Sequence, residues 1–343
     1  MPQHVYDVAV VGAGPIGLEL AVALKRAKAD YVHFDARQIG YTISWYPPQT
    51  RFFSSNERIA IAGVPLLTPD QGKATREQYL TYLRGVVQQF DLAVRTYEPV
   101  TGIDRMGDGF TLHTRSRAGP QETRARRLVL ATGGTDRARR LGAAGEELPH
   151  VTHDLGDPHT YFRRRVLVVG GRNSAIESAL RCHHAGASVS ISYRGASIAE
   201  NGIKYWLVPE FQSLVDSGRI AAYFETIVTR ITPTHVTLAD KAGATREVAA
   251  DFVLAQIGYE QDVSLFKKAG LELHGPRGAP VFDEETMQTP VPGLYVAGTA
   301  VGGTQEKYSV FIENCHVHVQ RIMRSILGVD VDAGCLKIDL PES

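Results

Sequence analysis

The chain has 343 residues, with 37 Lys and Arg side chains balanced by 37 Asp and Glu side chains. This length accommodates two ordinary domains, and the formal net charge of zero excludes recruitment of nucleic acid or an anionic membrane by net charge. No apolar run approaches the roughly 18 residues of a membrane span. The start has no basic or apolar leader pattern, so we expect a cytoplasmic protein. The three cysteines are widely spaced, which argues against a disulfide framework, a zinc site or a C-x-x-C redox pair.

The first strand and the turn after it carry the main signal. The apolar run Val8–Val11 predicts a buried parallel strand, and a helix is expected over Leu18–Arg26. The glycines between them have the G-x-G-x-x-G spacing of a dinucleotide-binding turn; they are Gly12, Gly14 and Gly17. The next strand, 31–34, ends in Asp35, where an acid accepts hydrogen bonds from an adenosine ribose. A chance glycine-rich turn is the weaker alternative.

An irregular stretch rich in aromatic and hydroxyl side chains follows at 38–55. We expect it to line a bound cofactor, because long irregular segments in compact domains are usually functional. The alternative is a surface loop held by packing of Trp45 and Phe52. Residues 74–90 predict an amphipathic helix. Short strands are expected at 92–96 and 110–115, and Gly107-Asp-Gly109 is typical of a hairpin turn.

The apolar strand ending in Ala131-Thr132-Gly133 is typical of the end of the first dinucleotide domain in flavoproteins with two such domains. Residues 141–161 are rich in Gly, Pro and His and predict a linker. A second strand, turn and helix follow at 165–185, with a further strand at 188–193. Arg172 stands where the middle glycine of the fingerprint belongs. The pyrophosphate is therefore slightly displaced, or the Arg172 side chain turns outward.

The end of strand 188–193 favours NADPH over NADH, because it carries no acid. Arg194 can make charge-assisted hydrogen bonds to a ribose 2′-phosphate, while Tyr193 packs on the adenine. Lys204 is a candidate second phosphate contact. The alternative for Arg194 is an exposed charge at a strand end.

Later segments complete both domains. Strands are expected at 220–224, 228–231, 235–238 and 246–248, and a further strand leads into Gly258 as the chain returns to the first domain. A last strand ends in Gly298, before a helix over 308–326. The predicted fold is therefore α/β, with two Rossmann-like dinucleotide-binding domains of three layers (ββα), the second inserted in the first. We expect the first domain at 1–145 and 257–343, with a C-terminal helix and tail, and the second at 146–256.

Several fragments resemble the YpdA family of bacillithiol disulfide reductases, within the thioredoxin-reductase-like flavoproteins. They are Trp45-Tyr-Pro-Pro-Gln-Thr-Arg-Phe-Phe-Ser-Ser55, Gly170-Gly-Arg-Asn-Ser-Ala175, Ile203-Lys-Tyr-Trp-Leu-Val-Pro-Glu-Phe211, Ile257-Gly-Tyr259 and Phe311-Ile-Glu-Asn314. The resemblance extends from residue 5 to about residue 322. It implies FAD in the first domain, NADPH in the second, and a homodimer.

Candidate cofactor-binding residues follow from these motifs. Those expected to hold FAD are Gly12, Gly14, Pro15, Ile16, Gly17, Asp35, Ala36, Trp45, Gln49, Phe53, Ser54, Thr132, Gly133, Gly298 and Thr299. Those expected to hold NADPH are Gly170, Gly171, Arg172, Asn173, Ser174, Ala175, Tyr193, Arg194, Lys204 and Gly258. No metal site is expected.

The chain also departs from the family. The resemblance implies a cysteine in the first glycine turn, where this chain has Ile16, and an aspartate where it has Thr299. Isoleucine cannot attack a disulfide. Cys315 is the candidate replacement, since a helix start and neighbouring histidines can lower a thiol pKa; a buried packing residue is the alternative. The neighbours His316 and His318 are interpreted as surface histidines rather than proton donors. Cys182 and Cys335 have no comparable case.

The sequence leaves the electron acceptor open. The first interpretation is an NADPH-oxidising FAD enzyme acting on a low-molecular-weight disulfide. The second is a ferredoxin or flavodoxin–NADP reductase, and the third a flavin monooxygenase or NADPH oxidase, although no F-x-G-x-x-x-H stretch supports the third. A dinucleotide-binding module without activity is a fourth. In every enzymatic case we expect a small-molecule or small electron-carrier substrate and no nucleic-acid or membrane partner.

Overall fold

The chain divides into two compact units. The computed structural model describes residues 4–198, 202–305 and 309–330. One unit comprises Met1–Arg137 with Tyr259–Ser343, and the other Ala138–Gly258. The first change of unit lies earlier than the expected 145/146, because Ala144 forms a bridge with Arg230 and its carbonyl accepts the N–H of Ile231 at 2.7 Å. Residues 138–145 are thereby tied to the inserted unit.

A mostly parallel sheet forms the centre of the larger unit. Its strand order is β3-β2-β1-β6-β5-β4, and β19 also pairs with β6. The strands are β1 (Val5–Val11), β2 (Tyr31–Phe34), β3 (Val94–Arg95), β4 (Val100–Met106), β5 (Gly109–Ser116), β6 (Gly119–Leu130) and β19 (Leu294–Val296). The β4-β5 and β5-β6 pairs are antiparallel, whereas the other pairs are parallel. The apolar run that predicted the first strand forms the buried half of β1.

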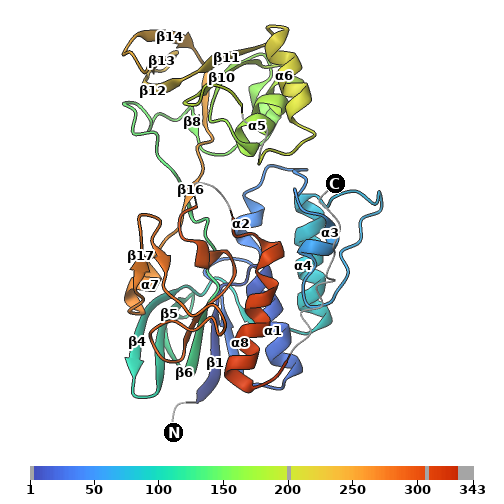
Figure 1. The fold of residues 1–343 in the computed structure, drawn as a ribbon, viewed down its shortest axis with the longest axis vertical. Coiled ribbons are helices and arrows are strands. Elements are labelled where there is room, and N and C mark those ends of the chain that lie inside the picture. The colour runs from blue at the N-terminus through green and yellow to red at the C-terminus, as the bar shows by residue number, and fades with distance from the viewer. Residues whose placement is uncertain (1–3, 199–201, 306–308, 331–343) are drawn as a thin grey trace. The chain divides into compact units, whose positions relative to one another are not determined.

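Two helices, α1 (Pro15–Arg26) and α8 (His316–Leu327), lie side by side in this unit (Figure 1). The other elements of the unit are α2 (Tyr41–Ser44), α3 (Asn56–Ile59), α4 (Arg76–Gln89), α7 (Ser264–Lys268), β17 (Leu273–His274), β18 (Ala279–Pro280), η2 (Gly298–Gly302) and η3 (Ile312–Asn314). α1 begins earlier than expected because the fixed φ of Pro15 suits a first helical turn.

The last helix begins later than the predicted residue 308, which itself lies outside the described residues. The Asn314 side chain accepts the N–H of Phe311 at 2.9 Å and donates to the Ser309 carbonyl at 2.8 Å. These side-chain hydrogen bonds replace the regular helical pattern, so residues 312–314 form the tighter turn η3 instead. Cys315 is consequently the N-cap of α8.

The hairpin prediction was right for its turn and wrong for one strand. β5 pairs with β4, which begins at Val100, whereas the expected strand at 92–96 contains only β3. β3 pairs instead with β2 at the opposite side of the sheet. The sequence around β4 alternates weakly and is mostly exposed, so it carries little of the periodicity that identifies a strand.

The inserted unit contains a parallel sheet and a smaller antiparallel one. The parallel sheet has the order β11-β10-β9-β15-β8, and β12, β13 and β14 form the other. The elements are β8 (Val151–Thr152), η1 (Pro158–Tyr161), β9 (Arg165–Val169), α5 (Asn173–His184), β10 (Ser188–Tyr193), α6 (Val208–Asp216), β11 (Ile220–Phe224), β12 (Thr226–Ile231), β13 (His235–Asp240), β14 (Thr245–Ala249) and β15 (Phe252–Ala255). The expected linker at 141–161 therefore contains β8, a strand of the sheet. β7 (Arg137–Ala138) and β16 (Tyr259–Glu260) pair where the chain crosses between units.

Candidate functional site

The first glycine turn leaves room for a ligand at the start of α1. Gly12 has φ of +109°, and a Cβ there would lie 2.3 Å from the Ala131 carbonyl oxygen. A Cβ on Gly17 would lie 1.9 Å from the Gly12 oxygen, so both positions require glycine. A Cβ on Gly14, in contrast, would meet nothing within 4 Å. Gly14 is the N-cap of α1, no side chain caps this end, and no acid lies in the first turn. This open, uncapped helix start fits a pyrophosphate.

Asp35 closes the same turn from the next strand. Its Oδ2 accepts the N–H of Ala13 at 2.6 Å, and its Oδ1 accepts the N–H of Arg37 at 2.7 Å. Burial raises the pKa of Asp35, although these backbone hydrogen bonds oppose the shift. Each carboxylate oxygen retains a lone pair that can accept a ribose hydroxyl. Ala36 follows Asp35 on the exposed side of the strand end.

Three chain segments meet at the far end of this turn. Gly298 has φ of +70°, and a Cβ there would lie 3.3 Å from Cβ of Ile16. The Gly134 N–H donates to Oγ1 of Thr299 at 3.2 Å, which joins the end of β6 to η2. The buried Oγ1 of Thr132 has no hydrogen-bond partner among the described residues. An orphaned hydroxyl beside these turns fits a site whose ligand supplies the partner.

The stretch expected to line a cofactor is more ordered than its sequence suggested, since it contains α2. The Trp45 ring centroid lies 6.2 Å from that of Tyr259. Phe52 is buried against Tyr79 at 4.6 Å, so this part matches the alternative of a loop held by aromatic packing. Phe53 is 40% exposed.

Two other expected FAD contacts of this stretch have partners inside the unit. The backbone N–H of Gln49 donates to Oε2 of Glu77 at 3.1 Å, near the start of α4. The buried Ser54 hydroxyl donates to Glu313 of η3. Ser54 is thereby tied to the segment that leads into α8.

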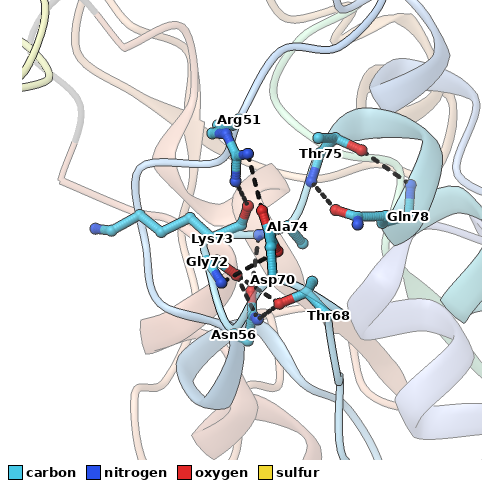
Figure 2. Close-up of polar contacts among 9 residues, drawn as sticks. All are labelled: Arg51, Asn56, Thr68, Asp70, Gly72, Lys73, Ala74, Thr75 and Gln78. Carbon is cyan, nitrogen blue, oxygen red and sulfur yellow. Dashed lines mark hydrogen bonds and ion pairs between the residues drawn. The ribbon is translucent and has the colours of Figure 1, made fainter.

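A polar network connects residues 51–56 to residues 68–78 (Figure 2). The Arg51 guanidinium donates to Asp70 at 3.0 Å. The Asn56 side chain donates to the Gly72 carbonyl at 3.0 Å and accepts the N–H of Ala74 at 2.8 Å. One side chain therefore binds the backbone of both Gly72 and Ala74, and the Thr68 hydroxyl donates to the same Gly72 carbonyl at 2.7 Å. The network fixes the end of the predicted cofactor-lining stretch to the start of α4.

The second glycine turn repeats the first. Gly170 has φ of +140°, and a Cβ there would lie 2.3 Å from the Gln256 carbonyl oxygen. Val169 pairs with Ser192 as Val11 pairs with Phe34, so Tyr193 occupies the place that Asp35 has in the first turn. A Cβ on Gly171 would lie 2.5 Å from the Tyr193 ring. The ring thus covers Gly171 of the inserted unit. Gly171 corresponds to Ala13 of the first turn, whose N–H donates to the Asp35 carboxylate.

The remaining expected NADPH contacts separate into exposed and internally bonded groups. Arg172, Ser174 and Arg194 are exposed, whereas Ala175 is buried. Arg172 is the N-cap of α5, and its exposure is in keeping with the outward alternative. Gly258 has φ of +97°, and its carbonyl accepts the N–H of Arg139 at 3.0 Å.

Lys204 has an internal partner. Its Nζ lies 2.7 Å from Glu177, and the residue is 7% exposed. The Asn173 side chain accepts the N–H of Lys204 at 2.6 Å and donates to the Gly202 carbonyl at 3.0 Å. The charge of Lys204 is therefore paired within the unit in this structure, which weakens its assignment as a second phosphate contact.

Of the two interpretations of Cys315, the buried packing residue agrees with the structure, and the lowered thiol pKa is wrong. Cys315 is fully buried, and burial, with the Glu19 and Glu313 carboxylates, raises the pKa of its thiol to about 12. Burial likewise raises the pKa of Cys182 to about 12. Cys335 lies outside the described residues. Neither described thiol is a thiolate near neutral pH.

The two histidines after Cys315 are buried rather than on the helix surface. His316 Nδ1 lies 2.7 Å from Oε2 of Glu19 on α1, and its Nε2 lies 2.9 Å from the Arg58 carbonyl oxygen. Burial lowers the pKa of His316, but the hydrogen bond and charge of Glu19 outweigh it, and the pKa is raised. His318 Nδ1 accepts the Gly298 N–H at 3.2 Å. Mainly because of burial, the pKa of His318 falls to about 4.

Sequence reasoning missed Glu19, the partner of His316, and Gln261, whose buried amide donates to the Gly133 and Ala300 carbonyls. Glu19 lies within an apolar helical run, where a buried acid signals an internal partner, but the sequence does not identify His316 as that partner. The described ranges bear on the expectation of no metal site. Within them, no cluster of acids, histidines and cysteines could hold a metal ion. In the same ranges no helix is both long enough and apolar enough to span a membrane.

The family model of the pyridine nucleotide-disulphide oxidoreductases matches residues 9–298. The chain belongs to this family. It is therefore an oxidoreductase, and the predicted cofactors, FAD and NADPH, are those of the family. The two-domain α/β fold predicted from the sequence is confirmed.

Individual relatives confirm the resemblance to YpdA. The oxidoreductase is 33% identical over 319 residues to bacilliredoxin reductase Bdr of Bacillus subtilis (strain 168), covering 92% of this chain and 96% of the relative. The solved bacillithiol disulfide reductase Bdr (YpdA) from Staphylococcus aureus superposes with a TM-score of 0.87 at 34% identity, over 95% of this chain and 99% of that one. A ferredoxin–NADP reductase of Ignicoccus hospitalis is 26% identical over 309 residues, covering 85% and 89% of the two chains.

Proposed function

We propose that this oxidoreductase holds FAD in the larger unit and NADPH in the inserted unit, and passes electrons to a small acceptor. The observation that carries the proposal is the pair of glycine turns. Each requires glycine for its φ and close approach, and each precedes a helix with no side-chain cap and no acid in its first turn. Two uncapped helix starts in separate units provide two anion sites for two dinucleotides.

In the larger unit, the roles follow from the hydrogen bonds. Gly12 and Gly17 shape the turn, Gly14 admits the pyrophosphate, and Asp35 both holds the Ala13 amide and accepts the ribose hydroxyls. Thr132 supplies an unpaired hydroxyl to the ligand. Bound by these residues, FAD would supply the redox chemistry, since a flavin can accept a hydride from NADPH and pass electrons to an acceptor.

In the inserted unit, NADPH preference rests on the two residues at the end of β10. Tyr193 replaces the acid that would bind a free 2′-hydroxyl, and the exposed Arg194 follows it. A guanidinium binds a phosphate with charge-assisted hydrogen bonds, whereas it gains less from a neutral hydroxyl.

For the acceptor we propose a low-molecular-weight disulfide, reduced directly from the flavin. The relatives named bacilliredoxin reductase and bacillithiol disulfide reductase support the disulfide. Ile16 and the protonated thiols of Cys182 and Cys315 offer no thiolate relay within the described residues. The same observation favours a second candidate, a ferredoxin-type carrier, because one-electron transfer from a flavin needs no thiol; a 26%-identical relative carries that name. The cytoplasmic location and the homodimer stay predictions within this proposal.

The deciding experiment is anaerobic. Purified protein is checked for flavin absorbance and for its oligomeric state, reduced with NADPH or NADH, and then given one acceptor at a time. Bleaching by NADPH followed by reoxidation with bacillithiol disulfide would support the first acceptor. Reoxidation by ferredoxin alone would move the assignment to the second candidate. A protein that binds no FAD, or that NADPH does not bleach, would contradict the proposal.

The coenzyme preference has its own test. Arg194→Ala should raise KM for NADPH by about 10- to 100-fold, because a charge-assisted hydrogen bond contributes roughly 1.5–3 kcal/mol, and should leave KM for NADH almost unchanged. Arg219→Ala, at another exposed arginine of the same unit, is the matched control. Equal losses with both coenzymes would show that Arg194 does not read the 2′-phosphate.

A further inference from the structure

Gln261 connects two of the turns assigned to FAD. It follows β16, at the point where the chain re-enters the larger unit, and is 3% exposed. Its amide nitrogen donates to the Gly133 carbonyl at 3.1 Å and to the Ala300 carbonyl at 3.0 Å. Its backbone N–H donates to Oγ1 of Thr304 at 3.0 Å. Gln261 thus binds three separate points of the unit, two through its side-chain amide and one through its backbone N–H.

The two carbonyls belong to different elements. Gly133 follows β6, and Ala300 lies within η2, the turn that begins at Gly298. The planar amide has both N–H groups on one nitrogen, so the positions of its two acceptors are coupled. The Thr299 hydroxyl makes the second connection between the same elements by accepting the Gly134 N–H.

The orientation of the Gln261 amide is fixed at a cost. Its Oε1 is buried and has no hydrogen-bond partner among the described residues. A reversed amide would place Oε1 against two carbonyl oxygens, which repel it, so only the observed orientation satisfies the backbone. An unpaired buried acceptor destabilises the folded chain, and such groups in native structures call for a functional explanation.

We propose that Gln261 is a positioning residue that sets the spacing between the Gly133 turn and η2 for cofactor binding. The inference rests on the proposed placement of FAD in this unit. Gln261 acts through the two carbonyls. Losing its two hydrogen bonds should let the turns separate and should weaken the affinity for FAD by about tenfold.

The test compares Gln261 with Gln256, a buried glutamine of the inserted unit whose amide donates to the His153 carbonyl at 3.2 Å. FAD affinity is measured by fluorescence quenching of the flavin-free protein, together with the flavin absorption spectrum and the thermal unfolding midpoint. Gln261→Ala should weaken FAD binding about tenfold and broaden the flavin bands, whereas Gln256→Ala should leave both unchanged.

Gln261→Glu gives a readout that general destabilisation does not. Its carboxylate cannot donate to either carbonyl, but the protonated acid can donate one hydrogen bond. FAD affinity of this variant should therefore rise as the pH falls, relative to the unchanged protein. Wild-type affinity and spectra in both Gln261 variants would overturn the inference. The inference would also be overturned if both Gln261 variants failed to fold while Gln256→Ala folded normally, because Gln261 would then be needed for folding alone. A wild-type protein that binds no FAD would overturn the proposed function, and this inference with it.

Discussion

Individual buried polar side chains connect parts of the larger unit that are far apart in sequence. Glu19 and His316 are separated by 297 positions, are each at most 3% exposed, and lie 2.7 Å apart. They join α1 to α8, and the His316 bond to the Arg58 carbonyl adds the end of α3. Removing one partner leaves the other charge buried and unpaired, which is far more damaging than losing a surface pair.

This pair makes stability depend on pH. The folded-state pKa of His316 is raised above its usual 6.5, so the folded protein binds more protons than the unfolded chain above that pH. The free energy of unfolding should therefore fall as pH rises from about 6.5 through the folded-state pKa. Glu19→Gln should remove this slope and lower stability by about 3–5 kcal/mol. Urea unfolding of the wild type and of Glu19→Gln between pH 6 and 9 measures the pH slope and the loss of stability. The same slope in both proteins would show that the Glu19–His316 pair does not cause it.

The thiols of Cys182 and Cys315 should not carry electrons. Burial holds the Cys315 thiol protonated, with its pKa raised to about 12, so Cys315→Ala should leave the rate of reoxidation by every acceptor within about twofold of the wild type. Cys182→Ala is the matched control, since burial raises its pKa equally. Selective loss of disulfide reduction in Cys315→Ala, with other acceptors unaffected, would make Cys315 catalytic after all.

At the scale of elements, prediction from sequence succeeded where local chemistry determines structure. β2, β10 and β11 have the bounds expected from their sequences, and the glycine turns lie where φ and close approach demand glycine. Prediction failed where a partner far away in the sequence determines the local structure. β8 is a two-residue strand defined by its pairing with β15. Gln261 likewise owes its role to carbonyls 128 and 39 positions away, which no local pattern reveals.

The start of α4 offers an element-scale prediction. Thr75 accepts the N–H of Gln78, and the Gln78 side chain accepts the N–H of Thr75, a complete capping box (Figure 2). Thr75→Ala should lower the free energy of unfolding by about 1 kcal/mol, whereas Thr75→Ser, which keeps the hydroxyl, should lose less than half as much. The denaturant concentrations at the unfolding midpoints of the two variants and the wild type measure these losses. Equal losses would show that packing of the threonine methyl matters more than the cap.

At the scale of the whole molecule, the two units have separate cores. Clusters around Leu20 and Tyr79 belong to the larger unit, whereas clusters around Ile191 and Leu238 belong to the inserted one. A ligand that binds only one unit should therefore stabilise that unit first, since it adds free energy only where it binds. The assignment of one dinucleotide to each unit can thus be tested without any turnover.

Hydrogen exchange provides this test. Adenosine 2′,5′-bisphosphate at about 100 times its Kd should add up to about 2.7 kcal/mol of protection. That protection should appear at 170–176 and 189–194 and be absent at 12–18. FAD added to flavin-free protein should give the opposite pattern. Protection of both turns by the bisphosphate would contradict the assignment.

The Tyr193 ring also has a consequence for how this coenzyme site can change over generations. A Cβ on either Gly171 or Gly195 would lie 2.5 Å from the ring, so in its present position this one side chain favours glycine at both places. Neither of these glycines has a left-handed φ, so the preference for glycine depends on the neighbouring ring rather than on the backbone. A lineage that replaced Tyr193 with an acid, and so turned toward NADH, would release both positions to drift. Once either had gained a side chain, a returning tyrosine would have to displace its ring, so the change of coenzyme would be harder to reverse than to make.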